Sequence, residues 1–300
     1  MTIVITGGSG FIGSQLSKRL LGLGHTVVVV DILPPSFTHE QLFFIHCDIT
    51  ASPLPYGVLE KTDAVINLVG RSIFGTWTPK VKQQILESRI KSTKHIVEGI
   101  VAATSKPSCF ICASAIGFYG DTGQEVIDEQ GGKGEGFLSD VVAQWEGVAR
   151  EATEHGVRVV CVRTAPVLGH GGMLSELTKT AKFGFLTRLS KKDFWMSWIH
   201  EEDIVNTYLF ALETTTVQGV FNASAPESVL HSSFMKSIGK GLRRRVIGYI
   251  PAFIVKKMFR DFFDEITKSQ RIAPKRLLDK GFVFSYPTLD SALKQILKKK

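Results

Sequence analysis

The chain has 300 residues, of which 44% are hydrophobic and 21% are charged. This composition is typical of a globular protein with a sizeable core, and it excludes a disordered chain. No apolar window is long enough to span a membrane, and no signal peptide precedes the first apolar segment. We therefore expect a cytoplasmic protein without a transmembrane segment.

The formal net charge is +8, and much of the positive charge lies late in the chain. A solvated basic rim is the simplest interpretation of these residues, and a patch that attracts an anionic substrate or a membrane surface is the alternative. No recognition motif accompanies the charge, so we expect no nucleic-acid partner. The basic runs are Arg243 to Arg245, Lys256 to Lys257 and Lys298 to Lys300.

The cysteines and histidines do not predict a metal site. Cys109 and Cys112 are three positions apart in a predicted strand, where they point to opposite faces and cannot share a metal. With Cys47 and Cys161, we expect four reduced core thiols, which suit a reducing compartment. No pair of histidines has metal-ligand spacing on one helix face.

The first 165 residues alternate short apolar runs with helical segments. The runs are apolar on both faces, as in Val27 to Val30, which is typical of parallel strands buried between helix layers. This alternation predicts an α/β fold with a Rossmann-type doubly wound parallel sheet. Thr78 followed by Pro79 is an N-cap signal for the second helix. The predicted strands are 3–5, 25–30, 43–45, 64–66, 109–113 and 157–162, and the predicted helices are 11–23, 79–103 and 137–155.

After Pro166 strands and helices no longer alternate regularly, and the sequence predicts a mixture of helices and extended segments. Gly, Pro and polar residues separate the segments, which are shorter than those before. The predicted elements are helices at 171–183 and 201–212, extended segments at 194–199 and 219–222, and mostly short helices from Pro226 onward.

Two structural units are expected from this organisation. Residues 1–166, with about 196–224 returning to them, form the dinucleotide-binding domain. Residues 167–195 and 225–300 form a smaller, mostly helical substrate lobe. Within that lobe, residues 247–263 mix aromatic and basic side chains at helical spacing, which predicts a lobe helix, with a peripheral membrane contact as the alternative.

A glycine-rich turn follows the first predicted strand and opens the first helix. Glycine removes the side chain where the turn is tight, where a pyrophosphate approaches and where the helix packs on the strand. The helix N-terminus then offers free N–H groups and positive potential to the phosphates. The sequence therefore predicts a dinucleotide site. Its predicted cofactor contacts are Thr6, Gly7, Gly10, Phe11, Ile12 and Gly13.

The second predicted strand ends at Asp31, whose carboxylate can accept hydrogen bonds from the ribose hydroxyls of an adenosine. A carboxylate repels a 2′-phosphate and no arginine follows immediately, so we expect NAD(P) as cofactor, with NAD favoured over NADP. Asp48, after the third strand, is a candidate adenine contact, and an ordinary turn aspartate is the alternative.

Motifs along the whole chain carry a family resemblance. With them the chain resembles the extended short-chain dehydrogenase/reductase superfamily, and more closely its atypical epimerase-family subgroup of nucleotide-sugar-epimerase-like proteins. The motifs, in order, are Thr6 to Gly13, Asn67 to Gly70, Trp77 to Pro79, Glu87 to Arg89, Ser114 to Gly120, Gly136 to Phe137, Trp145 to Glu146, Arg163 to Gly169, Met196 to His200, Phe221 to Pro226 and Gly281 to Phe282.

The resemblance implies further cofactor contacts at the carboxyl ends of two strands. Residues after the fourth strand would line the nicotinamide-side ribose and the pyrophosphate, and residues after the sixth would border the nicotinamide ring. Arg89 would contact the cofactor, with a pairing on the surface of its helix as the alternative. The other residues so assigned are Asn67, Leu68 and Gly70, and then Pro166, Val167 and Leu168.

The resemblance fails at the catalytic positions. Members of the superfamily usually carry Tyr-x-x-x-Lys on the helix after the fifth strand, where the tyrosine transfers a proton and the lysine lowers its pKa. Leu138 and Val142 stand at these positions here, and Ala115 stands where the assisting serine usually lies. Aliphatic side chains cannot move a proton. Either another group does so, or the protein performs no standard carbonyl–alcohol chemistry.

Ser114 and Tyr119 are the candidate catalytic residues near the expected crevice. The Tyr119 phenol can donate a proton or contact substrate or cofactor, with packing as the alternative, and the Ser114 hydroxyl can instead bond to backbone. Asp140 and Glu146 are expected to be solvated or to cap a neighbouring loop. His200 precedes a predicted helix and is expected to cap it or to satisfy a buried carbonyl.

Two functions stay open at this point. The first is a nicotinamide-dependent oxidoreductase or epimerase that acts on an unidentified small polar substrate. The second is a non-catalytic dinucleotide-binding regulatory or sensor protein, which Leu138 and Val142 favour. The sequence specifies neither the substrate nor the oligomeric state, because a fold does not determine its ligand.

Overall fold

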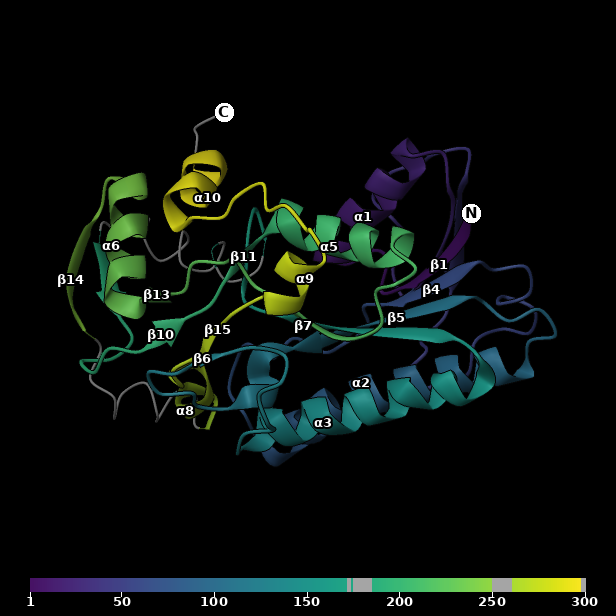
Figure 1. Cartoon of the computed structure of the whole chain (residues 1–300), viewed down its shortest axis with the longest axis horizontal. Helices are drawn as coiled ribbons and strands as arrows, with labels where there is room; N and C mark the ends of the chain where they lie inside the picture. The colour runs from purple at the N-terminus through teal and green to yellow at the C-terminus, as the bar shows by residue number, and fades with distance from the viewer. Residues whose placement is uncertain (172–173, 175–184, 250–260, 298–300) are drawn as a thin grey trace.

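The computed structural model describes residues 1–171, 174, 185–249 and 261–297. Its centre is a parallel sheet (Figure 1). The sheet has seven strands in the order β12-β7-β5-β4-β1-β2-β3. The chain winds outward from β1 to β3 and then returns to β4 on the other side, so the predicted doubly wound sheet is confirmed. The strands are β1 Thr2–Thr6, β2 Thr26–Asp31, β3 Leu42–His46, β4 Ala64–Asn67, β5 Cys109–Ala115, β7 Arg158–Thr164 and β12 Gly219–Ala223.

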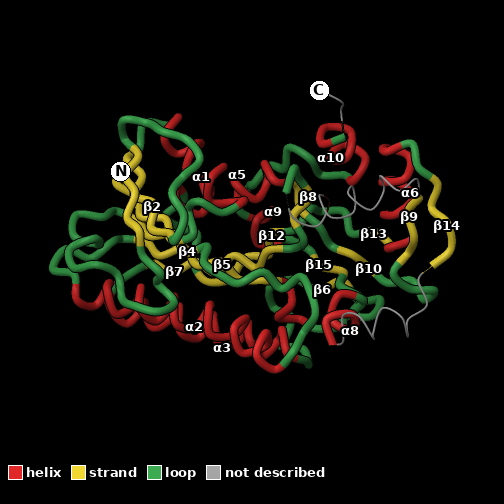
Figure 2. The backbone as a smooth tube through the Cα atoms, turned by 180° about the vertical axis from the view of Figure 1, so that it is seen from behind, coloured by secondary structure: helices red, strands yellow, loops and turns green. Residues whose placement is uncertain are grey.

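Helices cover both faces of this sheet, as Figures 1 and 2 show. Ile3 and Ile5 share a core with α1 and α5, whereas Val4 shares a core with α2 and α3. Neighbours along a strand point to opposite faces, which explains why these strands are apolar on both sides. The helices are α1 Phe11–Gly22, α2 Pro79–Ala102, α3 Phe137–Arg150 followed by the 3-10 turn η2 Glu151–His155, and α5 Glu201–Glu213.

Two helix starts confirm their predictions. The Thr78 side chain accepts a hydrogen bond from the Val81 N–H at 3.2 Å, and Pro79 is the first residue of α2. His200 Nδ1 accepts a hydrogen bond from the Glu202 N–H at 3.1 Å, so this histidine caps α5. Within the described ranges, no helix combines the length and the hydropathy that crossing a bilayer requires.

The edge strand β3 departs from its prediction. The run at 43–45 predicts a strand buried between helix layers, but Phe43 is 54% exposed and Phe44 is 38% exposed. β3 lies at the end of the strand order and has β2 as its neighbour on one side only. Aromatic residues favour a strand, but the position in the sheet decides how much of each side chain is covered.

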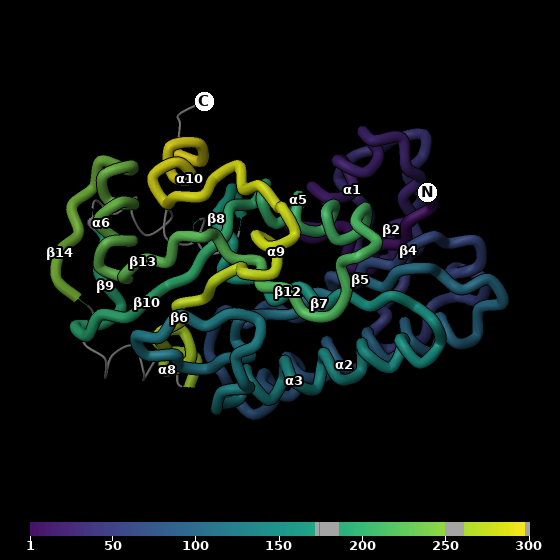
Figure 3. Tube along the Cα trace, viewed as in Figure 1, coloured from purple at the N-terminus to yellow at the C-terminus, as the bar shows by residue number. Residues whose placement is uncertain are grey.

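A smaller lobe lies beside the sheet, at the end of the molecule farthest from β1 and β2 (Figure 3). Its core contains Trp198, Phe234 and Leu293. Short strands pair as β8 with β11, β10 with β13, β9 with β14 and β6 with β15. Its elements and the connecting ones are η1 Ile116–Tyr119, β6 Val126–Ile127, β8 Val167–Leu168, β9 Phe185–Arg188, β10 Trp195–Met196, β11 Ile199–His200, β13 Val229–Leu230, α6 His231–Leu242, β14 Arg245–Tyr249, α8 Asp261–Ile266, β15 Arg271–Ile272, α9 Lys275–Asp279 and α10 Leu289–Ile296.

The lobe contains more strand than its sequence predicts. From residue 226 onward the expected short helices are present as α6, α8, α9 and α10, but β13, β14 and β15 interrupt them. The predicted helix at 247–263 is wrong at its start, because β14 pairs with β9 and Gly248 has a φ of 58°. The rest of that prediction up to residue 260 lies outside the described residues, as does most of the predicted helix at 171–183.

All four cysteines are buried and unpaired, as predicted. Burial raises the pKa of the Cys109 thiol to about 11 and that of the Cys161 thiol to about 12, so both thiols stay protonated in the core. In the part of the chain that the structure describes, no group of three or more His, Cys, Asp or Glu side chains is arranged to hold a metal ion.

A buried histidine in the lobe predicts a loss of stability in acid. His231 begins α6 and stacks on Phe194 with 4.6 Å between the ring centroids, and its Nδ1 has no hydrogen-bond partner among the described residues. Burial lowers the pKa of His231 from 6.5 to about 4. Because the unfolded chain binds this proton at higher pH than the folded chain, stability is full above pH 6.5 and is lost as the pH falls toward 4.

We expect the free energy of unfolding to fall by about 3 kcal/mol across this pH window on account of His231. Urea titrations at a series of pH values measure the change. The variant His231→Phe, which keeps a ring against Phe194, should lose this part of the pH dependence, whereas His155→Gln at an exposed position should keep it. An unchanged pH profile for His231→Phe would contradict the assignment.

Candidate functional site

The glycine-rich turn joins β1 to α1 at the carboxyl edge of the sheet. Gly7 has a φ of 76°, which favours glycine, and its N–H donates to the Val30 carbonyl at 2.9 Å. The Gly10 N–H donates to the Gly7 carbonyl at 3.1 Å and closes the turn. A side-chain carbon on Gly13 would collide with the Gly7 carbonyl and lie 2.7 Å from Gly8 Cα. The packing of the turn therefore requires glycine at residue 13.

The N-terminus of α1 offers backbone donors that no side chain of the described residues caps. Gly10 is the N-cap residue and has no side chain with which to cap the helix, and the first turn contains no acidic residue. Phe11 and Ile12 in that turn are half-buried. Uncapped N–H groups and the positive end of the helix dipole favour a phosphate at this position. The cradle therefore fits the diphosphate of a dinucleotide.

The Asp31 carboxylate holds the same turn from the end of β2. Its Oδ2 accepts a hydrogen bond from the Ser9 N–H at 3.0 Å, and its Oδ1 accepts one from the Leu33 N–H at 3.2 Å. Each carboxylate oxygen has two lone pairs, so Asp31 can still accept from ribose hydroxyls. The structure places Asp31 beside the turn, and the ribose contact stays a prediction.

Asp48 stabilises the turn after β3. Its Oδ1 accepts hydrogen bonds from the Thr50 N–H at 2.9 Å and from the Thr50 hydroxyl at 2.7 Å. The bond from the Thr50 hydroxyl lowers the pKa of Asp48. This is the role of an ordinary turn aspartate, the alternative that the sequence left open. Its adenine contact stays a prediction.

Thr6 and Asn67 are fully buried beneath the turn. Asn67 Oδ1 accepts a hydrogen bond from the Thr6 hydroxyl at 2.8 Å, and Asn67 Nδ2 donates to the Thr93 hydroxyl at 3.0 Å. These bonds tie β1 and β4 to α2, so both side chains hold the strand ends in place. Leu68 presents its backbone to the turn, because a side-chain carbon on Gly7 would lie 3.0 Å from the Leu68 carbonyl carbon.

Arg89 brings a positive charge from α2 to the end of β4. Its Nη1 donates to the carbonyls of Arg71 at 3.2 Å and Ile85 at 3.0 Å, and its guanidinium carbon lies 5.2 Å from the centre of the Trp145 ring. A side-chain carbon on Gly70 would lie 3.3 Å from the guanidinium, so glycine permits the close approach. Burial lowers the pKa of Arg89 to about 10, and no carboxylate of the described ranges opposes that shift.

The loop after β8 packs on the first turn of α1. Glu201 Oε2 accepts hydrogen bonds from the His170 N–H at 3.0 Å and from Gln15 Nε2 at 3.2 Å. A side-chain carbon on Gly171 would lie 2.6 Å from the Phe11 ring. The buried carboxylate of Glu201 thus joins α1, α5 and this loop, and it brings the segment after β7 to the glycine-rich turn.

The residues predicted to border the nicotinamide ring differ in exposure. Pro166 is exposed and Val167 is half-buried, whereas Leu168 is fully buried in the core of the small lobe. β8 pairs with β11 through Val167 and Leu168, so the backbone here connects the sheet to the lobe. Leu168 is 0% exposed as a whole residue, so it offers a ligand no open surface.

α3 has aliphatic side chains at the catalytic positions. Leu138 packs in the cluster that contains Trp77 and Phe262, and Val142 is 2% exposed. A side-chain carbon on Gly117 would lie 3.3 Å from Leu138 Cβ, so Leu138 faces the turn η1 after β5. The structure therefore places no proton-transfer group of α3 at residues 138 or 142.

Ser114 belongs to a buried polar network between β5, β7 and α3. Its hydroxyl donates to Glu146 Oε1 at 2.6 Å, and Arg163 donates from Nε and Nη2 to the two Glu146 oxygens at 2.7 and 2.8 Å. Glu146 is only 1% exposed, so the prediction that it is solvated or caps a loop is wrong. It lies on the face of α3 that packs on the sheet. Asp140 is exposed and pairs with Lys133 at 2.6 Å, as expected of a solvated side chain.

Tyr119 is buried, and its phenol donates a hydrogen bond to Asn222 Oδ1 at 2.7 Å. Burial raises the pKa of the phenol, which makes Tyr119 a weaker acid than a free tyrosine. The Arg163 guanidinium lies 3.4 Å from the centre of the Phe118 ring and 4.9 Å from that of Tyr119. One network therefore brings Ser114 and Tyr119 together, and their catalytic roles stay predictions.

The sequence contains a signal for one interaction that its analysis missed, the pairing of Glu146 with Arg163. Arg163 directly follows the apolar run 159–162 of a buried strand, and a cation there requires an anion. Glu146, on the helix that precedes this strand, is that anion. Thr93 and Asn222, which hold Asn67 and Tyr119, give no comparable signal because neutral polar residues are common at strand and helix ends.

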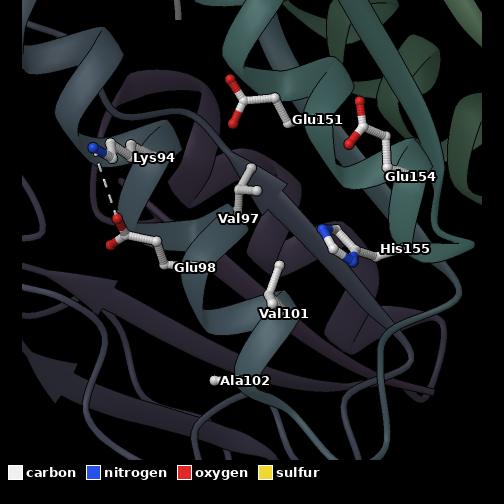
Figure 4. A pocket seen from close by; sticks show the side chains of 8 residues that line it. All are labelled: Lys94, Val97, Glu98, Val101, Ala102, Glu151, Glu154 and His155. Carbon is white, nitrogen blue, oxygen red and sulfur yellow. Dashed lines mark ion pairs between the residues drawn. The ribbon is translucent and has the colours of Figure 1, made fainter.

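A hollow of about 640 Å³ lies between α2 and η2 (Figure 4). α2 leads into the start of β5 and η2 leads into the start of β7, so this hollow lies at the opposite end of the sheet from the glycine-rich turn. A second hollow, of about 390 Å³, adjoins Tyr119 after the carboxyl end of β5. Ligands of open parallel sheets bind at the carboxyl ends of the strands, which favours the second location. The residues around the first hollow are Lys94, Val97, Glu98, Val101, Ala102, Glu151, Glu154 and His155.

Comparison with known proteins agrees with this geometry. The model of the NAD dependent epimerase/dehydratase family matches residues 3–224, and that of a domain of unknown function, DUF1731, matches residues 250–296. The chain is 33% identical over 298 residues to the epimerase family protein YfhF of Bacillus subtilis, covering 99% of this chain and 98% of that protein. It is 31% identical over 305 residues to the chloroplastic epimerase family protein SDR39U1 homolog of Arabidopsis thaliana, covering 99% and 87% of the two chains.

A solved structure also matches the whole chain. The crystal structure of human epimerase family protein SDR39U1 with NADPH superimposes with a TM-score of 0.87 at 28% sequence identity, covering 100% of both chains. The glycine-rich turn, the doubly wound sheet and these likenesses support one assignment. The chain therefore belongs to the NAD-dependent epimerase/dehydratase family, as an NAD(P)-binding protein of the atypical short-chain dehydrogenase/reductase type.

Proposed function

We propose that NAD(P) lies along the carboxyl edge of the sheet, with its diphosphate on the turn from Gly7 to Gly13. The observation that carries this placement is the N-terminus of α1, which no described side chain caps, beside a turn that requires glycine at residues 7 and 13. Arg89 supports it, because a half-buried cation that no carboxylate of the described residues pairs with favours an anionic ligand. The hydrogen bond between Thr6 and Asn67 holds the ends of β1 and β4 next to the turn. Leu68, Gly70 and Pro166 to Leu168 lie along the same carboxyl edge of the sheet.

We infer a preference for NAD over NADP from Asp31. The relative of known structure contains NADPH, so the choice has to be measured on this chain. We expect NADH to bind about tenfold more tightly than NADPH, because the Asp31 carboxylate repels a 2′-phosphate. The variant Asp31→Asn removes this charge while it keeps an acceptor for Ser9, and it should bring the two affinities together. Isothermal titration calorimetry measures both.

Asp48→Asn is the matched control for this comparison, because Asp48 serves the turn after β3 and should leave the ratio of affinities unchanged. Tighter binding of NADPH than of NADH by the unmodified chain would refute the preference. It would leave the placement of the diphosphate intact, since both cofactors contain that group.

The proposed activity is that of an NAD(P)-dependent oxidoreductase or epimerase on a small polar substrate, held between residues 1–166 and the lobe of residues 167–195 and 225–300. When bound, the nicotinamide supplies the hydride chemistry. The chain's own residues bind and orient the cofactor and the substrate. The Glu146–Arg163 pair fixes the Ser114 hydroxyl as a donor to Glu146, so Ser114 can only accept from a substrate group. A proton at the substrate has to be moved by a group other than Leu138 and Val142.

A specific observation favours a second candidate, a dinucleotide-binding regulatory or sensor protein. Leu138 and Val142 cannot transfer a proton, and the hydroxyls of Ser114 and Tyr119 are already bonded in the interior. Such a protein would bind the cofactor tightly and change its affinity for a partner without turnover. Its cofactor site would be the same.

One experiment separates the two candidates. The chain is incubated with NADH deuterated at C4 and a panel of ketones and quinones, and separately with NAD⁺ and a panel of sugar nucleotides, which are the hydride donors in that arm. Deuterium in a reduced ketone or quinone, or an epimer or NADH formed in the second arm, supports the oxidoreductase or epimerase, and chromatography with mass spectrometry detects each. Tight binding of both cofactors with none of these products refutes the enzyme on this substrate class and favours the sensor.

We further infer a reducing compartment, with the cytoplasm as the expected one. The cysteines are buried thiols without a disulfide among them. Such thiols are typical of compartments where glutathione and thioredoxin keep cysteine reduced.

A further inference from the structure

We propose that the outer strip of the small lobe binds an anionic lipid surface. The outer strip consists of Arg243, Arg245, Ile247 and Tyr249, on and just before β14, with Arg188 of the neighbouring strand β9. β14 forms the end of the molecule opposite to β1, both in the view of Figures 1 and 3 and from behind in Figure 2. The proposal does not depend on the cofactor site.

The geometry of β14 turns these side chains outward. Val246 packs against the core of the small lobe, so Arg245 and Ile247, its neighbours along the strand, face solvent. Ile247 is 56% exposed and Tyr249 is 44% exposed. The pairing of β14 with β9 places Tyr249 beside Arg188. An aliphatic side chain, a tyrosine and two arginines thus lie exposed on one strip, beside the half-buried Arg188.

The segment that carries most of the outer strip is basic. Residues 229–249 contain five Lys and Arg residues and no Asp or Glu. Like charges that lie close together repel one another, and an anionic surface reduces that repulsion. Clusters of exposed Lys and Arg are attracted to acidic headgroups for the same reason. The five basic residues, all exposed, are Lys236, Lys240, Arg243, Arg244 and Arg245.

The side chains between the arginines favour a lipid surface over a nucleic acid. Ile247 gains from burial among acyl chains, and the tyrosine ring suits the level of the headgroups. A surface for single-stranded nucleic acid presents several aromatic rings on which bases stack. Within residues 229–249, Tyr249 is the one exposed aromatic side chain.

Vesicle co-sedimentation of the whole chain tests the proposal. We expect binding to vesicles of phosphatidylcholine with phosphatidylserine, weak binding to phosphatidylcholine alone, and release at about 1 M salt, where the Debye length falls to about 3 Å. The double variant Arg243→Gln, Arg245→Gln should lower the partition coefficient about 30-fold. The charge-matched control Arg19→Gln, Lys80→Gln, at exposed positions of α1 and α2, should stay within about twofold of the unmodified chain.

A third variant tests the apolar contact. Ile247→Gln should weaken binding to the acidic vesicles a few-fold and leave its salt dependence unchanged, because it removes no charge. Equal binding to both kinds of vesicle, no binding to either, or full binding by the double arginine variant would overturn the proposal. So would tighter binding of homopolymeric RNA that displaces the vesicles. NADH binding by the double variant should be normal, so a negative result leaves the cofactor proposal untouched.

Discussion

Replacing Glu146 with glutamine is expected to lower the free energy of unfolding by about 3–5 kcal/mol. The Glu146 carboxylate accepts two hydrogen bonds from Arg163 and one from Ser114, all in the interior. Burial lowers the pKa of Arg163, but the bonds and charge of Glu146 outweigh that effect and raise the pKa overall. An arginine side chain does not lose its proton inside a protein, so Arg163 keeps its charge in the variant, and its guanidinium is left 4% exposed without a full counter-charge. Urea unfolding followed by circular dichroism measures the loss.

Two controls separate the buried charge from other effects of substitution. Asp279→Asn breaks an exposed pair with Lys275 and should leave the free energy of unfolding almost unchanged. The double variant Glu146→Leu, Arg163→Leu removes both charges and should be much more stable than Glu146→Gln, because no unpaired ion is left. If Glu146→Gln were no more harmful than Asp279→Asn, the pair would not stabilise the interior.

The sheet could be predicted because its signals are local. Runs such as Val27 to Val30 are apolar on both faces, and this pattern alone indicates a strand between two helix layers. The error at Phe43 and Phe44 has a different origin: a run of similar character lies at the sheet edge, and no local pattern gives the strand order. β14 was missed for the same reason, since its partner β9 lies far away in sequence.

The candidate site also has one part that the sequence predicts and another part that it does not. The turn from Gly7 to Gly13 is contiguous, so its sequence specifies its conformation. The Tyr119 and Glu146 side chains are oriented by contacts with β12 and β7. Such contacts between distant segments cannot be predicted from the spacing of residues along the chain. A glutamate on a helix is usually solvated, and the pairing with Arg163 is what reverses that expectation here.

Substitution of Gly13 by alanine is expected to lower the affinity for NADH about 100-fold or more, which corresponds to about 2.7 kcal/mol. The added carbon would collide with the Gly7 carbonyl and approach Gly8 Cα to 2.7 Å, and backbone atoms cannot rotate away as a side chain can. The first turn of α1 would have to move away from β1, and its N–H groups would leave the diphosphate. Isothermal titration calorimetry gives the affinity, and thermal unfolding shows whether the fold persists.

Other glycines of the same segment test whether position, rather than loss of glycine, causes the effect. Gly22 lies in α1 with open space around an added carbon, so Gly22→Ala should leave binding unchanged and stabilise the helix by up to about 1 kcal/mol. At Gly10 an added carbon would lie 3.2 Å from the Gly7 carbonyl, so Gly10→Ala should fold. Its methyl group would nevertheless stand at the N-cap, where the diphosphate approaches, and should weaken binding about tenfold. Unimpaired NADH binding by both Gly13→Ala and Gly10→Ala would show that the diphosphate lies elsewhere.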